Sequence, residues 1–122
     1  MPSFSASDSL TVDIYFVTWQ TNDMTDAELF RALANDRRLQ ILAWLKEPTA
    51  HFPPQRDGDL VKDGVCGQLI AEKLGINAST LSEHMRVLQG CGLVTGKKIK
   101  QWIFYRRDSE RLRTLASIVD SL

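Results

Sequence analysis

Residues 77–89 (NASTLSEHMRVLQ) constrain the fold more than any other stretch of this chain. Asn77 is a good helix N-cap, because its side-chain oxygen accepts a hydrogen bond from a free amide of the first turn. Wound as an α-helix, the segment separates into two faces. The apolar face carries Leu81, His84, Met85 and Leu88, and the polar face carries Ser79, Ser82, Glu83 and Arg86. The pattern predicts a helix with one side in a core, where His84 packs beside leucines.

A second helix is predicted directly before this one, at residues 67–74 (GQLIAEKL). Its apolar stripe ends at Gly75, which permits the left-handed backbone that terminates a helix. Ala71 is small enough to let the following helix pack closely across it. A helix, a tight turn containing Gly and a second helix form a helix-turn-helix, whose second helix enters the major groove of DNA.

Two β-prone runs follow, at residues 93–98 and 101–107, and the second (QWIFYRR) is rich in strand-forming residues. A basic tip is expected between them at residues 98–100. Trp102 and Tyr105 are expected to serve in packing of the wing and in an interface, and not as platforms on which bases stack. The predicted fold class is therefore mainly α with a two-stranded β-wing, a winged helix-turn-helix.

The distribution of charge favours a nucleic-acid partner, although the formal net charge of the 122-residue chain is zero. Residues 78–107 contain six basic and one acidic side chain, a net charge of 6 − 1 = +5. Positive charge is thus concentrated on the segment that would meet phosphates. The length and the 43% hydrophobic content predict one folded domain over residues 24–122.

The N-terminal extension, residues 1–23, contains a β-branched and aromatic run at 11–19 that predicts a strand or an apolar surface for a partner. A capping box of Thr25 and Glu28 starts the first helix of the domain. Asn35 or Asp36 caps a second helix, which Pro48 is expected to end. The expected core positions of that second helix are Leu39, Leu42 and Leu45, with Ile41 flanking them.

Residues 47–64 form a long loop without a secondary-structure period. Such a loop is uncommon in a small domain and is often functional. Asp57, Asp59 and Asp63 resemble a calcium loop superficially, but Val61 occupies a ligand position and no glutamate completes the site. We predict a solvated loop and no metal or other cofactor.

Two cysteines do not make a disulfide framework, and neither a signal peptide nor a membrane-length apolar run is present. A cytoplasmic protein with reduced thiols and no membrane partner is expected. Cys66 lies at a predicted helix N-terminus, where the helix dipole stabilises a thiolate, and Cys91 lies just beyond the DNA-reading helix. A redox role for both is one hypothesis, and burial as small apolar residues is the other.

Three segments together resemble the ArsR (arsenic-responsive) family of winged-helix repressors: LFRALANDRRLQIL at 29–42, CGQLIAEKLGI at 66–76 and STLSEHMRVLQGCGLV at 79–94. Residues 101–106 also resemble the family's second wing strand. The resemblance implies a homodimer, built from the first and last helices, that binds an operator until an inducer releases it. The last helix, residues 108–122, has the matching amphipathic spacing. The implied interface residues are Leu29, Leu112, Leu115, Ala116, Val119 and Leu122.

The sequence also departs from this family in ways that bear on the inducer. Metal-sensing members carry Cys-x-Cys before the DNA-reading helix, whereas Gln68 stands two residues after Cys66 here. Other members bind zinc through histidines of the last helix, and residues 108–122 contain none. One thiolate without a second soft ligand makes a poor Zn²⁺ site, so no metal is predicted.

The expected mechanism is binding of a double-stranded operator. The polar face of the second helix would read bases through Ser79, Ser82, Glu83 and Arg86. Phosphates would be contacted by Thr80, Lys97, Lys98, Lys100 and Arg106. The alternative is a winged helix that binds another protein and no operator. An enzyme is not expected, because neither His51 nor His84 is placed as a general base beside a nucleophile.

Overall fold

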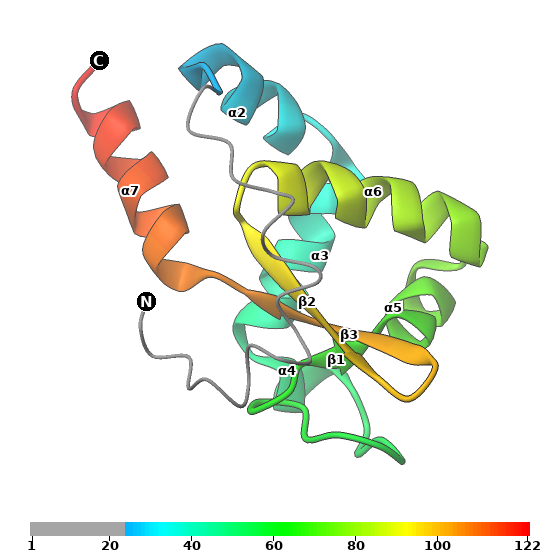
Figure 1. The fold of residues 1–122 in the computed structure, drawn as a ribbon. Coiled ribbons are helices and arrows are strands. Elements are labelled where there is room, and N and C mark those ends of the chain that lie inside the picture. The colour runs from blue at the N-terminus through cyan, green and yellow to red at the C-terminus, as the bar shows by residue number, and fades with distance from the viewer. Residues whose placement is uncertain (1–23) are drawn as a thin grey trace.

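The structure, a computed structural model, describes residues 24–122, so the predicted extension and its apolar run lie outside the described residues. The chain forms a helical body around a small antiparallel sheet (Figure 1). In chain order the elements are α2 (Asp26–Leu33), α3 (Asp36–Lys46), α4 (Pro48–His51), β1 (Val65–Cys66), α5 (Gly67–Leu74), α6 (Ala78–Gly90), β2 (Val94–Ile99), β3 (Trp102–Arg107) and α7 (Ser109–Asp120). The predicted winged helix-turn-helix is confirmed.

Local capping explains where the helices begin. The Thr25 hydroxyl accepts from the Glu28 amide at 3.1 Å, and the Glu28 carboxylate accepts from the Thr25 amide at 3.0 Å, which completes the predicted capping box. Asn35 caps α3 and Asp108 caps α7. Each cap satisfies an amide that the helix itself leaves without a partner.

The core position of α3 corrects one expectation. Ile41 is fully buried together with Leu42 and Leu45, whereas Leu39 is 47% exposed. Around the helix axis, the buried side chains point in a direction close to that of Leu45. Leu39 points more than a quarter turn away from this direction. Leu39 was therefore wrong as a core residue, and Ile41 is central to the core.

The sheet has three strands in the order β1-β3-β2, one more than the predicted two-stranded wing. The extra strand pairs Val65 with Tyr105 and Cys66 with Phe104. In the hairpin, β2 and β3 pair from Val94 opposite Arg107 to Ile99 opposite Trp102. The turn is Lys100 and Gln101, so Lys98 and Ile99 belong to the strand and not to the tip as predicted.

The long loop is more structured than expected, because Pro48 starts the short helix α4 and does not only end α3. Phe52 then anchors the loop in the core, with its ring edge-on to Trp44 at a centroid distance of 6.0 Å. Gly64 returns the chain to the sheet at φ +111°, where an added Cβ would lie 2.6 Å from the Tyr105 carbonyl oxygen. Only glycine fits this close approach.

The exit from α6 differs in detail from the prediction that Gly90 stops the helix. Gly90 is the last helical residue, and the left-handed conformation belongs to Gly92 at φ +75°. The chain then enters β2, and α7 is tied back to this corner by a bond from Arg111 Nε to the Cys91 carbonyl at 3.1 Å. Every helix within residues 24–122 is too short or too polar to cross a lipid bilayer.

Candidate nucleic-acid interface

The helix-turn-helix consists of α5 and α6, joined by a turn at Gly75 with φ +72°. Ala71 is buried, and α5 packs against α6. Asn77 caps α6 by accepting from the Thr80 amide at 2.8 Å. These contacts fix the start of α6 and therefore the direction in which its polar face points.

The two faces of α6 are separated as the sequence predicted. Leu81, Met85 and Leu88 are buried, and the candidate base-reading side chains Ser79, Ser82, Glu83 and Arg86 are all exposed. Arg86 donates to the Glu83 carboxylate one turn earlier on the same exposed face. A helix that keeps hydroxyls, an acid and a guanidinium in solvent presents the donors and acceptors that base edges require.

His84 lies on the buried face, where the sequence placed it. Its Nδ1 is 3.3 Å from Nη1 of Arg38, and its Nε2 is buried without a hydrogen-bond partner among the described residues. Burial, helped by the positive charges of Arg38 and Arg37, lowers the pKa of His84 below its usual value. The imidazole is therefore a neutral packing residue on the inner side of α6.

The wing does not bring the predicted phosphate-contacting residues onto one surface. In an antiparallel ladder, paired residues share a face and successive residues alternate. Lys97 pairs with Phe104, and Lys98 pairs with Ile103. The face of Lys98 is the one that packs against the helix-turn-helix, because Gly67 of α5 lies against Tyr105 and the Ile103 carbonyl. The face of Lys97 carries the long loop.

Acidic residues of the long loop pair with two of these lysines. Lys97 Nζ lies 2.7 Å from Oδ1 of Asp63, and Lys100 Nζ lies 3.2 Å from Oδ1 of Asp57. Partial burial by itself raises the pKa of the Asp63 carboxyl. The bond from Lys97, the Asp59 amide and the nearby positive charges outweigh that effect and lower this pKa. Lys98 and Arg106 are free of such pairs among the described residues.

The acidic residues that superficially resembled a calcium loop are used within the protein. Asp59 accepts from the amides of Val61 and Lys62, at 3.0 and 2.7 Å, and Asp63 accepts from the amide of Asp59 at 2.7 Å. Within residues 24–122, no three His, Cys, Asp or Glu side chains are gathered closely enough to share a metal ion. The carboxylates instead shape the loop and hold it on the wing.

The two thiols occupy different environments. Cys91 is buried, and this burial raises the pKa of its thiol. Cys66 is half-buried at the N-terminus of α5, and it lines a cavity between the long loop and the sheet. The cysteines are unbonded. Only Cys66 has the access that thiol chemistry requires.

The predicted dimer-interface residues divide into two groups. Leu29 and Leu115 are already buried within the chain itself, and Leu112 is half-buried. Ala116, Val119 and Leu122 are exposed, Val119 by 52% and Leu122 by 92%. The side of α7 that carries Ala116 and Val119, together with Leu122 beyond the end of the helix, is thus an exposed apolar surface.

Three features of this region could not be found by sequence reasoning: strand β1, the Asp–Lys pairs and the cavity beside Cys66. The acidic spacing at residues 57–63 and the lysines at 97–100 were both visible, but nothing local joins segments about 34 to 43 residues apart. The opposite charges of the two runs are the one signal that favoured their pairing.

The sequence profile of the bacterial regulatory protein, arsR family, matches residues 67–95, which run from α5 into β2. The HTH-type transcriptional regulator YbzH of Bacillus subtilis is 41% identical over 96 residues, covering 79% of this chain and 96% of YbzH. The transcriptional activator HlyU of Vibrio cholerae is 30% identical, covering 84% of this chain and 82% of HlyU.

Among solved structures, the chain is similar to a homodimeric winged helix-turn-helix DNA-binding domain from Mycobacterium bovis, described as a possible ArsR-family regulator. The TM-score is 0.54 at 27% identity, and the match covers 78% of this chain and 75% of that domain. The match thus spans most of residues 24–122.

Proposed function

Because this chain belongs to the ArsR family of bacterial regulatory proteins, we propose that it is a homodimeric repressor of transcription that binds an operator in double-stranded DNA. Its place of action would be the cytoplasm, and a signal would release it from the operator. The single observation that supports the DNA contact most is the exposed polar face of α6, which faces away from a closely packed apolar face.

In this proposal α6 lies in the major groove and reads bases. Arg86 donates two hydrogen bonds to a guanine, and Glu83 accepts from cytosine N4. These two side chains are paired with each other in the free protein, so DNA must replace their mutual contact with contacts to bases. The short hydroxyl side chains Ser79 and Ser82 allow the helix backbone to approach the groove floor.

Phosphate contacts would come from the start of α6 and from the wing. Thr80 lies in the first turn of α6, where amides and hydroxyls suit a phosphate. Lys98 and Arg106 are exposed and have no ion pair among the described residues, so they are ready to neutralise phosphates. Lys97 and Lys100 must first exchange their loop aspartates for DNA.

Dimerisation is supported by the exposed apolar edge of α7 and by the Mycobacterium bovis domain, which is described as homodimeric. In the family the first and last helices, here α2 and α7, form the interface. They lie at the same end of the molecule, away from the wing tip (Figure 1). A two-fold dimer would place two copies of α6 on two half-sites about one helical turn of DNA apart.

The test is fluorescence anisotropy with the DNA immediately upstream of the gene that encodes the chain, measured at several salt concentrations. Affinity should fall steeply with salt, with a logarithmic slope of about 0.9 for each phosphate contacted. Arg86→Ala should weaken binding to the operator by about 1–3 kcal/mol and relax the preference at one base pair in each half-site. Lys98→Ala should weaken binding to all sequences equally.

Lys46→Ala is the matched control, because it removes one exposed positive charge at the end of α3, outside the proposed interface. It should leave both affinity and slope unchanged. Salt-independent binding, or equal losses in all three variants, would favour the alternative of a protein-binding winged helix. A reporter gene placed behind the same DNA then shows whether bound protein lowers transcription, as a repressor must.

The role proposed here is binding and not catalysis. Neither histidine is hydrogen-bonded to a thiol within residues 24–122, and His84 is enclosed on the core side of α6, where it contacts Arg38. His51 ends the short helix α4. A poised base within hydrogen-bond reach of a nucleophile is the minimum for covalent catalysis.

A further inference from the structure

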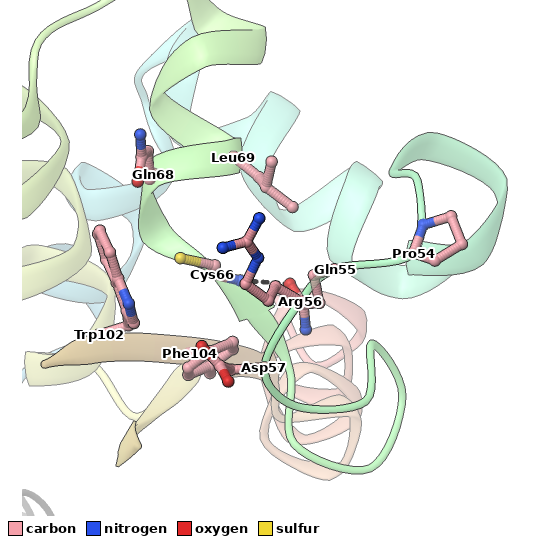
Figure 2. Close-up of a pocket in the computed structure, with 9 residues that line it drawn as sticks. All are labelled: Pro54, Gln55, Arg56, Asp57, Cys66, Gln68, Leu69, Trp102 and Phe104. Atoms are coloured by element: carbon pink, nitrogen blue, oxygen red, sulfur yellow. Dashed lines mark hydrogen bonds between the residues drawn. The ribbon is translucent and has the colours of Figure 1, made fainter. Parts of the chain in front are cut away.

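A cavity of about 340 Å³ lies between the long loop, the start of α5 and strand β3 (Figure 2). Its volume falls within the range of about 300–1,000 Å³ that is typical of small-molecule sites. Separate segments of the chain contribute to its lining: Arg56 comes from the loop, Cys66 from the end of β1, Leu69 from α5, and Trp102 and Phe104 from β3. A ligand bound here would contact the helix-turn-helix and the wing together.

The walls of this cavity are largely apolar. The Phe104 ring is almost completely buried and closes one side, with Gly58 of the loop lying against it. Trp102 and Leu69 are half-buried and line the open part. Flat aromatic and branched apolar side chains around a small space favour a flat apolar ligand, which they can contact on both of its faces.

Two of the polar side chains that line the cavity are already engaged, and its one cationic side chain is not. Gln55 donates to the Gly64 carbonyl at 2.7 Å and accepts from the Cys66 amide at 3.1 Å, and Asp57 pairs with Lys100. Arg56 has neither a hydrogen bond nor an ion pair within residues 24–122, and its side chain points from the loop into the cavity (Figure 2). The charge left for a ligand is therefore a single guanidinium.

We propose that this cavity binds a small aromatic carboxylate, whose ring lies between Trp102 and Leu69 and whose carboxylate pairs with Arg56. The guanidinium fork matches a carboxylate with two parallel hydrogen bonds, and the partly enclosed site strengthens that pair. The buried Phe104 ring excludes water from the far side of the ligand. Size, shape and charge each contribute to this choice of ligand class.

The position of the cavity also couples it to DNA binding, a step that rests on the proposed function. Trp102, Cys66 and Gln68 line a second cavity as well, of about 590 Å³, which reaches Ser82 of α6. Asp57 of the first cavity holds Lys100 at the wing turn. A ligand that joins Arg56 of the loop to Trp102 of the wing would hold the loop in place and keep Lys100 paired with Asp57. It would also change the surroundings of Ser82, a proposed base-reading residue. The occupied protein should bind its operator more weakly.

The experiment uses 2-naphthoate as the probe and the uncharged 2-naphthamide as its matched control, each titrated calorimetrically into the full chain without DNA. The carboxylate should bind saturably and more tightly than the amide. Arg56→Gln should reduce naphthoate affinity roughly 10- to 100-fold, as expected for the loss of a hydrogen bond between charged groups, and leave naphthamide affinity unchanged. Arg56→Lys keeps the positive charge but not the forked guanidinium. Its affinity for naphthoate should lie between that of the unaltered protein and that of Arg56→Gln.

Arg56 is exposed on the loop, so its substitution leaves the core intact, which circular dichroism verifies. Lys46→Gln removes a positive charge elsewhere and should leave naphthoate binding unchanged. The absence of saturable binding, equal affinities for the two probes, or an unchanged affinity in Arg56→Gln would overturn the site.

Operator affinity, measured with and without saturating 2-naphthoate, tests the coupling separately. A weaker complex in the presence of the probe supports the regulatory step, and an unchanged complex overturns that step alone. If the protein binds naphthoate through Arg56 but binds no DNA, the proposed function fails while the ligand site stands.

Discussion

His84 shows how a single side chain can link the DNA-reading helix to the pH of its surroundings. Its ring packs on the core side of α6 beside Arg38, a permanent cation that also donates to the Ala32 carbonyl at 2.6 Å. A protonated imidazole would be buried next to that guanidinium. The folded state therefore favours the neutral form of His84, and protonation of this ring at low pH destabilises the fold.

We expect the protein to lose stability as the pH falls below about 6.5, the ordinary pKa of histidine. The pKa of His84 is lower in the folded state, so between the two pKa values the unfolded chain binds a proton that the folded chain does not. Stability therefore rises with pH through this window, and the contribution is fully present above it. Urea unfolding across the window measures the effect in the protein and in His84→Leu, whose pH dependence should be shallower. Parallel curves would refute the assignment.

The two cysteines should differ sharply in reactivity. Iodoacetamide at neutral pH should modify one thiol per folded chain, at Cys66, because Cys91 is enclosed and burial raises the pKa of its thiol. Peptide mapping by mass spectrometry identifies the modified residue, and in urea both thiols should react. Rapid modification of Cys91 in the folded protein would show that the end of α6 opens readily.

Residue-scale features were predictable from the sequence where the cause is local. Asn77 and Thr25 cap helices because the hydrogen bonds involved span three residues, which the sequence displays directly. Leu39 was misplaced because two helix faces are compatible with the apolar spacing. One face contains Leu39, Leu42 and Leu45, and the other contains Ile41, Leu42 and Leu45. Packing against β3 and α6, and not helix periodicity, decides between them.

At the scale of elements, the helices and the hairpin could be predicted, but strand β1 could not. A segment of two residues is too short to show the alternation of apolar and polar side chains that predicts a strand. Val65 and Cys66 form a strand only because β3 offers an open edge for them to pair with. The same long-range packing brings the loop aspartates to the wing lysines and encloses the cavity. The candidate DNA-reading face was thus visible in the sequence, whereas the surface beside Arg56 was not.

The contact between the loop and the wing should oppose DNA binding at Lys100. Asp57→Asn removes the carboxylate that pairs with Lys100, so this lysine can contact a phosphate without first breaking an ion pair. We expect operator affinity to increase roughly two- to fivefold at low salt, the range for one exposed pair. The slope of affinity against salt should steepen at the same time, which anisotropy titrations measure.

Asp59→Asn is the matched control for this experiment. It removes the same charge from the same loop, but Asp59 accepts backbone amides of its own turn and has no ion pair among the described residues. Its effect on affinity should be smaller than that of Asp57→Asn. Equal gains in both variants would mean that only the total charge of the loop matters, and not the pair with Lys100.

At the scale of the whole molecule, the two proposed surfaces lie at opposite ends of the domain. The wing tip and α5 occupy one end, and α2 and α7 occupy the other (Figure 1). Between them, the core cluster joins α3, α5, α6 and the sheet into one packed body. A dimer formed through α7 would thus leave both copies of the helix-turn-helix exposed to the same duplex.

The exposed edge of α7 provides the test of that arrangement. Val119→Glu places a charge on the apolar edge, where a partner's helix would bury it without a counter-charge, so the dimer should dissociate. Val119 suits this test better than Leu115, because Leu115 is buried in its own chain and its loss would unfold the monomer. Sedimentation equilibrium measures the mass of the protein in solution, which should fall to that of a monomer. Operator affinity should fall as well, because each monomer reads only one half-site. Ser117→Glu adds the same charge on the opposite, exposed side of α7 and should remain dimeric. A dimeric Val119→Glu protein with normal operator affinity would place the interface elsewhere.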